Sequence, residues 1–179
     1  MQKDKIKILA ISGSLRANSS NHKLLNKIAL MIPAGIDFTV YNDLGNLPHF
    51  NDEENYEIVN KWRHMIKDAD GILICTPEYA FGVPGSLKNA LDWTVSSGDF
   101  YNKPVALITA SSAGDKAHTS LMQTLTALTA ITTQESTLLI PFIRSKFNDK
   151  EEPDETTTAS LQIVLAAFIK NIKGNTNHE

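Results

Sequence analysis

The stretch GILICTPEYAFGVPG, at residues 71–85, decides the fold that the sequence predicts. Its first six residues, apart from Thr76, are apolar or glycine, which is typical of a strand buried on both faces. The nine residues that follow contain two prolines and two glycines, which indicate a loop. A strand buried on both faces needs helices on both sides of its sheet. The stretch therefore predicts a parallel sheet in an α/β fold.

The rest of the chain repeats this alternation of strands and helices. Further β-branched, apolar runs predict strands at residues 6–12, 37–41, 105–110 and 136–141. Apolar side chains at helical spacing predict helices at about residues 21–32, 53–67, 84–95, 116–130 and 157–173. The segments 42–52 and 144–157 are interpreted as irregular. We therefore expect one domain over residues 1–179, with a five-stranded parallel sheet covered by helices on both faces.

Composition and charge exclude several classes of protein. A formal net charge of −3 over 179 residues argues against a nucleic-acid binder, which would carry a basic face. The one cysteine, Cys75, cannot form a disulfide within the chain and indicates a reducing, cytoplasmic setting. The apolar run near the N-terminus, about six residues long, is too short to act as a signal sequence or to span a membrane. We expect no nucleic-acid partner and no membrane attachment.

The loop after the first strand has the composition of an anion site. It leads into a helix N-terminus, where free backbone N–H groups attract anions. The candidate ligands in it are Ser14, Arg16, Ser19, Ser20 and Asn21. The loop is neither a GxxxxGK[ST] phosphate loop nor a GxGxxG dinucleotide fingerprint, which argues against a nucleoside triphosphate and against NAD held in that way. The alternative is that a serine only caps the helix and the arginine is solvated.

Two further loops leave the carboxyl ends of strands, where ligands bind in open parallel sheets. In residues 76–85, Tyr79 and Phe81 are large and flat, and Gly82 allows the backbone to approach a ligand closely. In residues 110–116, small side chains and Gly114 would suit a flat ring. The alternative is that the aromatic residues only cover the end of the core. A phosphate at the first loop and a flat ring at the other two together point to FMN.

Two sequence motifs connect the predicted FMN site to a known protein family. Residues 13–21, GSLRANSSN, resemble the G-S-x-R-x-x-S-x-N loop of the NAD(P)H-dependent FMN reductase family. Residues 76–93, TPEYAFGVPGSLKNALDW, are similar to that family's T-P-E-Y-x-x-x-x-P-G-x-L-K-N-A-x-D-W segment. The resemblance implies a flavodoxin-like three-layer sandwich with strand order 2-1-3-4-5. It also implies non-covalent FMN, NADPH or NADH as co-substrate, and a homodimer or homotetramer.

The resemblance also assigns roles to residues. It implies phosphate contacts from the first loop, an isoalloxazine and ribityl contact from the second, and closure of the other edge by the third. Ala80 stands where many family members have asparagine. The candidate FMN-binding residues are Ser14, Arg16, Ser19, Ser20, Asn21, Pro77, Glu78, Tyr79, Ala80, Phe81, Gly82, Ser111 and Gly114.

No catalytic side chain and no metal site are predicted, because the cofactor carries the chemistry in such an enzyme. The five histidines are scattered without metal-ligand spacing. His22 and His64 are interpreted as surface residues, and His118 is a candidate to approach the ligand from just past the third loop. Cys75 is expected to be a small buried side chain. Helix packing, capping or a subunit contact is expected of Lys88, Asn89, Asp92 and Trp93.

The leading hypothesis is an oxidoreductase that passes hydride from NAD(P)H through FMN to a quinone, a flavin, an azo dye or a metal ion such as chromate. The alternative is a flavodoxin-type electron carrier without NAD(P)H activity of its own. The mild charge and the TPEY segment argue against that carrier. A third hypothesis, a scaffold that has lost its cofactor, conflicts with the intact loop around Arg16 and Ser19.

Overall fold

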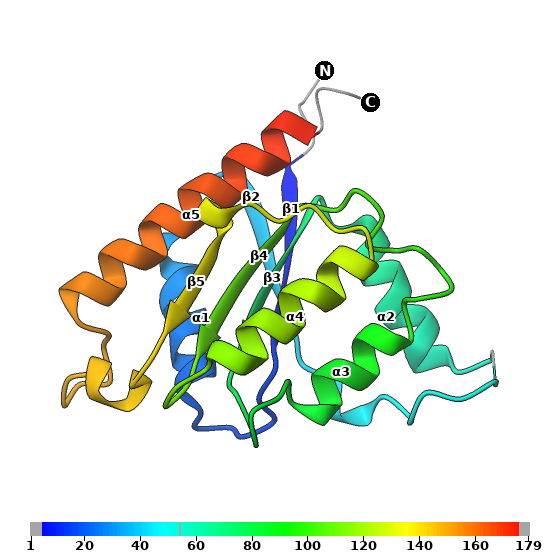
Figure 1. Ribbon diagram of the computed structural model, residues 1–179. Helices are drawn as coiled ribbons and strands as arrows, with labels where there is room; N and C mark the ends of the chain where they lie inside the picture. The colour runs from blue at the N-terminus through cyan, green and yellow to red at the C-terminus, as the bar shows by residue number, and fades with distance from the viewer. Residues whose placement is uncertain (1–4, 54, 176–179) are drawn as a thin grey trace.

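A parallel five-stranded sheet forms the centre of the protein (Figure 1). The computed structural model describes residues 5–53 and 55–175. The strands are β1 (Ile6–Ser12), β2 (Ile36–Tyr41), β3 (Gly71–Thr76), β4 (Val105–Ala110) and β5 (Thr137–Ile140). They lie in the order β2-β1-β3-β4-β5, which confirms the order that the family resemblance implies. The chain changes direction across the sheet between β1 and β3, which makes the carboxyl end of this pair the switch point.

Helices cover both faces of the sheet (Figure 1). The helices α1 (Ser20–Met31) and α5 (Glu155–Asn175) lie on one face. The other face carries α2 (Glu57–Asp68), α3 (Gly85–Asp92) and α4 (Asp115–Ala127). Short 3-10 helices occur at η1 (Leu44–Asn46), η2 (Gln134–Ser136) and η3 (Ile143–Lys146). Among the described helices, none combines the length and the apolar character needed to cross a membrane.

Side chains alternate between two apolar cores, one on each face of the sheet. Along β1, Leu9 and Ile11 join the core beneath α2, α3 and α4, whereas Ile8 and Ala10 join the core beneath α1 and α5. Every residue of β3 and β4 is buried, as expected of central strands covered on both faces. This burial fixes the register of the strands, since a shift by one residue would exchange the two faces.

Several helix boundaries differ from the sequence prediction, and at two of them a side chain caps or turns the backbone. Helix α2 begins at Glu57 rather than at residue 53, because Asn51 accepts from the N–H of Glu53 and donates to Tyr56 Oη, which holds a turn. Helix α5 begins at Glu155 rather than at residue 157, because Asp154 Oδ1 accepts from Thr157 N at 2.7 Å. Helix α3 ends at Asp92 rather than at residue 95, and turns follow it.

One buried hydroxyl in the core gives a test of the packing. The Oη of Tyr41 is buried and has no hydrogen-bond partner among the described residues. Its ring packs against Trp62, with the ring centroids 4.6 Å apart. Burial, with a smaller contribution from the negative charge of Asp43, raises the pKa of Tyr41 to about 12. A buried polar group without a partner destabilises the folded state.

We expect Tyr41→Phe to raise the free energy of unfolding by about 1 kcal/mol at pH 7, because the unpaired hydroxyl is removed. Between pH 10 and about 12 the phenol ionises in the unfolded chain but not in the folded one. The wild-type protein therefore loses stability as the pH rises through this range, and the variant loses less. Urea unfolding at pH 7 and pH 11 measures both effects. Tyr101→Phe, at an exposed tyrosine, is the control. A less stable Tyr41→Phe variant would contradict the prediction.

Candidate functional site

The carboxyl ends of the strands meet at one edge of the sheet, the lower edge in Figure 1. A cavity of about 270 Å³ lies there among the loops that follow β1, β3, β4 and β5. Its lining residues are Ser14, Arg16, Asn18, Ser19, Ser20, Asn21, Pro77, Glu78, Tyr79, Ala110, Ser111, Ser112, Ile143 and Arg144. The cavity thus joins segments from positions 14 to 144 of the chain. Nine of the thirteen predicted site residues line it.

The first loop brings an arginine and free backbone N–H groups together at the start of α1, as the sequence predicts for an anion site. Ser19 is the N-cap of this helix, and its Oγ accepts from His22 N at 3.2 Å. The capping role left open for a serine is therefore real, and it coexists with a place at the cavity. Ser20 and Asn21 are the first residues of α1, so their N–H groups have no acceptor within the helix. Arg16 is exposed at the cavity, and its N–H donates to Ser14 Oγ at 3.3 Å.

His22 holds this loop in place, although the sequence suggested only a surface residue. Its Nε2 lies 2.9 Å from the carbonyl oxygen of Ser14, and the side chain is half-buried. The difference arises because the loop folds back over the first turn of α1. Sequence pattern alone gives no sign of that contact, since it depends on the path of the five residues between Ser14 and the helix start at Ser20. His178 lies outside the described residues.

Asn21 connects the first loop to two central strands. Its side chain is buried, its Nδ2 donates to Ala110 O at 3.3 Å, and its Oδ1 accepts from Cys75 Sγ at 3.3 Å. These partners occupy its amide, so a contact from that amide to phosphate stays a prediction. Burial raises the pKa of the Cys75 thiol far above its usual range, and the thiol is a packing group as expected.

Hydrogen bonds join the loops around the cavity into one rim. Ser14 Oγ and Tyr79 Oη lie 3.3 Å apart, which connects the first loop to the second. Glu78 Oε2 accepts from Ala117 N at 2.8 Å, and Ser111 Oγ donates to Glu78 O at 3.4 Å, which connects the second loop to the third and to α4. The site is therefore largely positioned before any ligand binds.

The tip of the second loop turns away from the cavity. Tyr79 and Gly82 exchange backbone hydrogen bonds of 3.0 and 2.9 Å around a two-residue turn. Both residues of this turn, Ala80 and Phe81, have positive φ values of 48° and 59°. This is the backbone of a type I′ hairpin turn, which normally contains Asn-Gly. The Phe81 side chain is 78% exposed. Neither turn residue lines the cavity, and nor does Gly82.

We expect Phe81→Gly to raise the free energy of unfolding by about 0.5–1 kcal/mol. Side chains other than glycine destabilise the left-handed conformation by about 1–2 kcal/mol, and the greater freedom of glycine in the unfolded chain offsets part of the gain. Phe81→Ala removes the same exposed ring but keeps the strained backbone, so it should not be stabilised. Urea denaturation of both variants tests this. An equal gain in both would assign the effect to the ring rather than to the backbone.

Gly114, the last predicted site residue, shapes the third loop without lining the cavity. It has a φ of 100° and is the N-cap of α4. A Cβ at this position would lie 2.9 Å from Leu139 Cδ1. The positive φ would strain any other residue, and an added Cβ would also have to displace the end of the Leu139 side chain. The role of Gly114 is therefore to place α4 beside the site.

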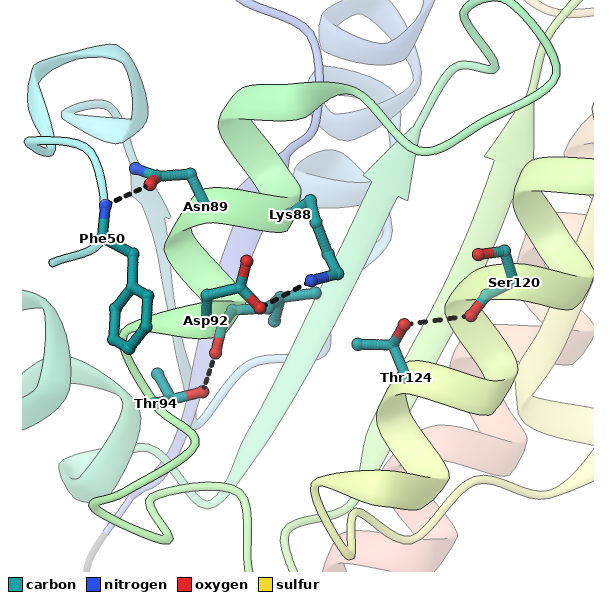
Figure 2. Close-up of polar contacts among 8 residues, drawn as sticks. Phe50, Lys88, Asn89, Asp92, Thr94, Ser120 and Thr124 are labelled. Carbon is teal, nitrogen blue, oxygen red and sulfur yellow. Dashed lines mark hydrogen bonds and ion pairs between the residues drawn. The ribbon is translucent and has the colours of Figure 1, made fainter.

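The LKNALDW segment supports the loop after β2. Figure 2 shows Asn89 on α3 pointing toward the segment that carries Phe50, whose N–H donates to Asn89 Oδ1 at 2.8 Å. Asn89 Nδ2 and Trp93 Nε1 both donate to Pro48 O at 2.9 Å. Lys88 and Asp92 form an i,i+4 ion pair on the side of α3 that faces α4 (Figure 2). These contacts agree with the packing role expected from the sequence.

His118 is partly buried and hydrogen-bonded to β4, and it does not line the cavity. Its Nδ1 lies 2.9 Å from Thr109 Oγ1, and burial lowers its pKa. It is not among the residues that line the cavity. Within residues 5–53 and 55–175, no cluster of three or more His, Cys, Asp or Glu side chains could hold a metal ion.

Five lining residues were missed by the sequence prediction. They are Asn18, Ala110, Ser112, Ile143 and Arg144. The first three belong to loops that were already singled out. Ile143 and Arg144 follow β5, and Arg144 is the first residue of the segment 144–157 that was interpreted as irregular. A signal was present there, because residues 141–146 leave the carboxyl end of a strand and contain one of only three arginines.

Comparison with known proteins supports the resemblance seen in the motifs. The model of the NADPH-dependent FMN reductase family matches residues 6–144. A 2-hydroxy-1,4-benzoquinone reductase from a Burkholderia species is 42% identical over 91 residues, which are 49% of each chain. The quinone reductase of Escherichia coli K12 is 29% identical over 177 residues, 92% of this chain and 94% of that protein. The chain thus spans about half the length of the first relative and nearly all of the second.

Among solved structures, the flavoenzyme NAD(P)H:(acceptor) oxidoreductase FerB from Paracoccus denitrificans is similar in fold. The TM-score is 0.82 at 25% sequence identity, over 95% of this chain and 98% of that one. The family match covers both motifs and all five strands of the sheet, β1 to β5. The family predicted from the sequence is therefore confirmed: the chain belongs to the NADPH-dependent FMN reductase family.

Proposed function

We propose that the protein, as a single domain over residues 1–179, binds FMN in this cavity and uses NAD(P)H to reduce a small flat acceptor, with quinones the first class to test. One observation carries the proposal: the anion-binding loop of Arg16 and the Pro77–Tyr79 segment open onto the same cavity. The Arg16 loop would then hold the phosphate of FMN and the Pro77–Tyr79 segment its planar ring, with the ribityl chain between them. The acceptor class follows from the names of the two curated relatives described above.

The residues around the cavity fit a phosphorylated flavin. A phosphate monoester carries a charge of roughly −1.5 to −2 at pH 7 and needs cations and N–H donors. The first loop supplies a guanidinium, serine hydroxyls and the N-terminus of α1. Glu78 is the one carboxylate among the lining residues, and it already accepts from Ala117 N. The charge balance therefore favours an anion.

When bound, FMN would supply the redox chemistry, taking a hydride from NAD(P)H and delivering electrons to the acceptor. The protein's part is to hold and orient the ligands. The hydrogen bond between Ser14 and Tyr79 and the one from Ala117 to Glu78 would hold the phosphate end and the ring end in place relative to each other. We propose no acid–base side chain, because Glu78 is engaged and His118 does not line the cavity. The homodimer or homotetramer and the cytoplasmic location stay proposals.

A visible absorption spectrum tests the function directly. Purified protein is mixed with FMN, and NADPH and then a benzoquinone are added without oxygen. We expect a bound-flavin spectrum that bleaches with NADPH and returns with the quinone. Bound flavin that stays oxidised with both NADPH and NADH would overturn the reductase and favour the flavodoxin-type carrier. A protein that takes up no FMN would overturn the cofactor site itself.

A further inference from the structure

A second arginine lies at the cavity, from a part of the chain outside both family motifs. Arg144 belongs to η3, immediately after β5, and lines the same cavity as Arg16. The chain contains three arginines in all, so two of the three meet at this one site. The third, Arg63, is engaged elsewhere: its Nε donates to Trp93 O at 2.8 Å, and its guanidinium also contacts Ser96 Oγ.

The backbone before Arg144 is fixed against the third loop. Phe142 N donates to Ser112 O at 3.1 Å, and Ile143 N donates to Ser111 O at 3.0 Å. Ile143 is buried and anchors the turn in the core beneath α1 and α5. Because Ser111 and Ser112 themselves line the cavity, these bonds place residue 144 at its edge. The backbone position of Arg144 is therefore held by these hydrogen bonds and by the buried Ile143 side chain.

The charges nearby leave Arg144 available to a ligand. Lys146, on the same short helix, pairs with Asp154 at 3.9 Å, and Lys23 pairs with Glu151 at 2.6 Å. Among the residues that the structure describes, neither Arg16 nor Arg144 forms an ion pair. Two guanidinium groups at one cavity, in a protein of net charge −3, point to a ligand that carries two negative charges.

We propose that Arg144 contacts the phosphate of FMN together with Arg16, and that this pair makes the site selective for FMN over riboflavin. The inference rests on the proposed function, since it assumes that FMN occupies this cavity. One guanidinium balances one of the two charges of a phosphate monoester, and the second balances the other. The planar fork of an arginine also matches the geometry of phosphate oxygens.

NADPH offers a second phosphate that Arg144 could contact, the one on its ribose. We favour the FMN phosphate because Arg144 shares its cavity with Arg16, Ser19 and Ser20, which form the anion-binding loop at the start of α1. The two sources predict different results. Contact with FMN changes flavin affinity, whereas contact with NADPH changes the ratio of the KM values for NADPH and NADH.

Flavin titration of the Arg144→Ala variant tests the proposal, with FMN and riboflavin measured separately by fluorescence quenching. We expect FMN affinity to fall about 3- to 10-fold, as for a partly exposed ion pair, while riboflavin affinity stays the same. Added salt should weaken FMN binding less in the variant than in the wild type. Arg144→Lys should recover part of the loss. Lys170→Ala, which removes one exposed positive charge near the far end of α5, should change nothing.

Three results would overturn the assignment while leaving the proposed function intact. They are unchanged FMN affinity in Arg144→Ala, an equal loss for FMN and riboflavin, and a change in the NADPH to NADH ratio alone. A wild-type protein that binds no FMN is a different failure, because it would overturn the proposed function and this inference with it. The melting temperature of each variant confirms that it is folded.

Discussion

Replacing Arg16 with alanine is expected to weaken FMN binding by about 1.5–3 kcal/mol, roughly 10- to 150-fold. The side chain stands at the cavity, and its removal takes a charge-assisted hydrogen bond from the phosphate. Riboflavin has no phosphate, so its affinity should stay close to that of the wild type. Titrating flavin fluorescence with each ligand, at one fixed salt concentration, gives both constants.

The matched control for Arg16→Ala is Arg16→Lys, which keeps the charge and loses the planar fork. Its affinity should lie between those of the wild type and the alanine variant. Because Arg16 is exposed and forms no ion pair with any described residue, its loss should leave the free energy of unfolding without FMN unchanged. Unchanged FMN affinity in the alanine variant would exclude this loop as the phosphate site.

Replacing Gly13 with alanine is expected to lower the free energy of unfolding by about 1–3 kcal/mol, as overpacking a buried site does. A Cβ at residue 13 would lie 2.2 Å from Thr76 Oγ1, 2.7 Å from Thr76 Cβ and 3.1 Å from Leu87 Cδ2. Thr76 and Leu87 are both fully buried, so neither can move freely. The first loop must shift away from β3, and Gly13 N would lose its 2.8 Å hydrogen bond to Cys75 O.

Two comparisons separate this clash from a general effect of replacing glycine. Gly85→Ala adds the same methyl group where nothing lies within 4 Å, at the first residue of α3, and should be neutral or slightly stabilising. Adding Thr76→Ala to Gly13→Ala removes the nearest atom and should cancel part of the loss. Urea unfolding measures stability, and FMN titration reports the displaced loop. A Gly13→Ala protein as stable as Gly85→Ala would show that the loop is not held against β3.

Local sequence patterns determined the layers of this fold and the chemistry of its first loop. The apolar run at residues 71–76 predicted a strand that is covered on both faces. Apolar residues at helical spacing between the strands predicted the helices that cover it. Arg16, Ser19 and the start of α1 are near neighbours along the chain, so their meeting needs no long-range contact. The strand order came from the resemblance of two motifs to a family, because no local pattern states which strands are neighbours.

Only the tertiary structure decided which distant groups share the cavity and which side chains are already engaged. The strand order places β4 between β3 and β5, and this brings Arg144 to the loop that carries Ser111. Packing also gives Asn21 its partners on β3 and β4, and the backbone turn at Phe81 directs that ring away from the cavity. Periodicity and turn propensity describe residues a few positions apart. Contacts across many tens of residues depend on how the strands assemble, so they become visible only in the folded chain.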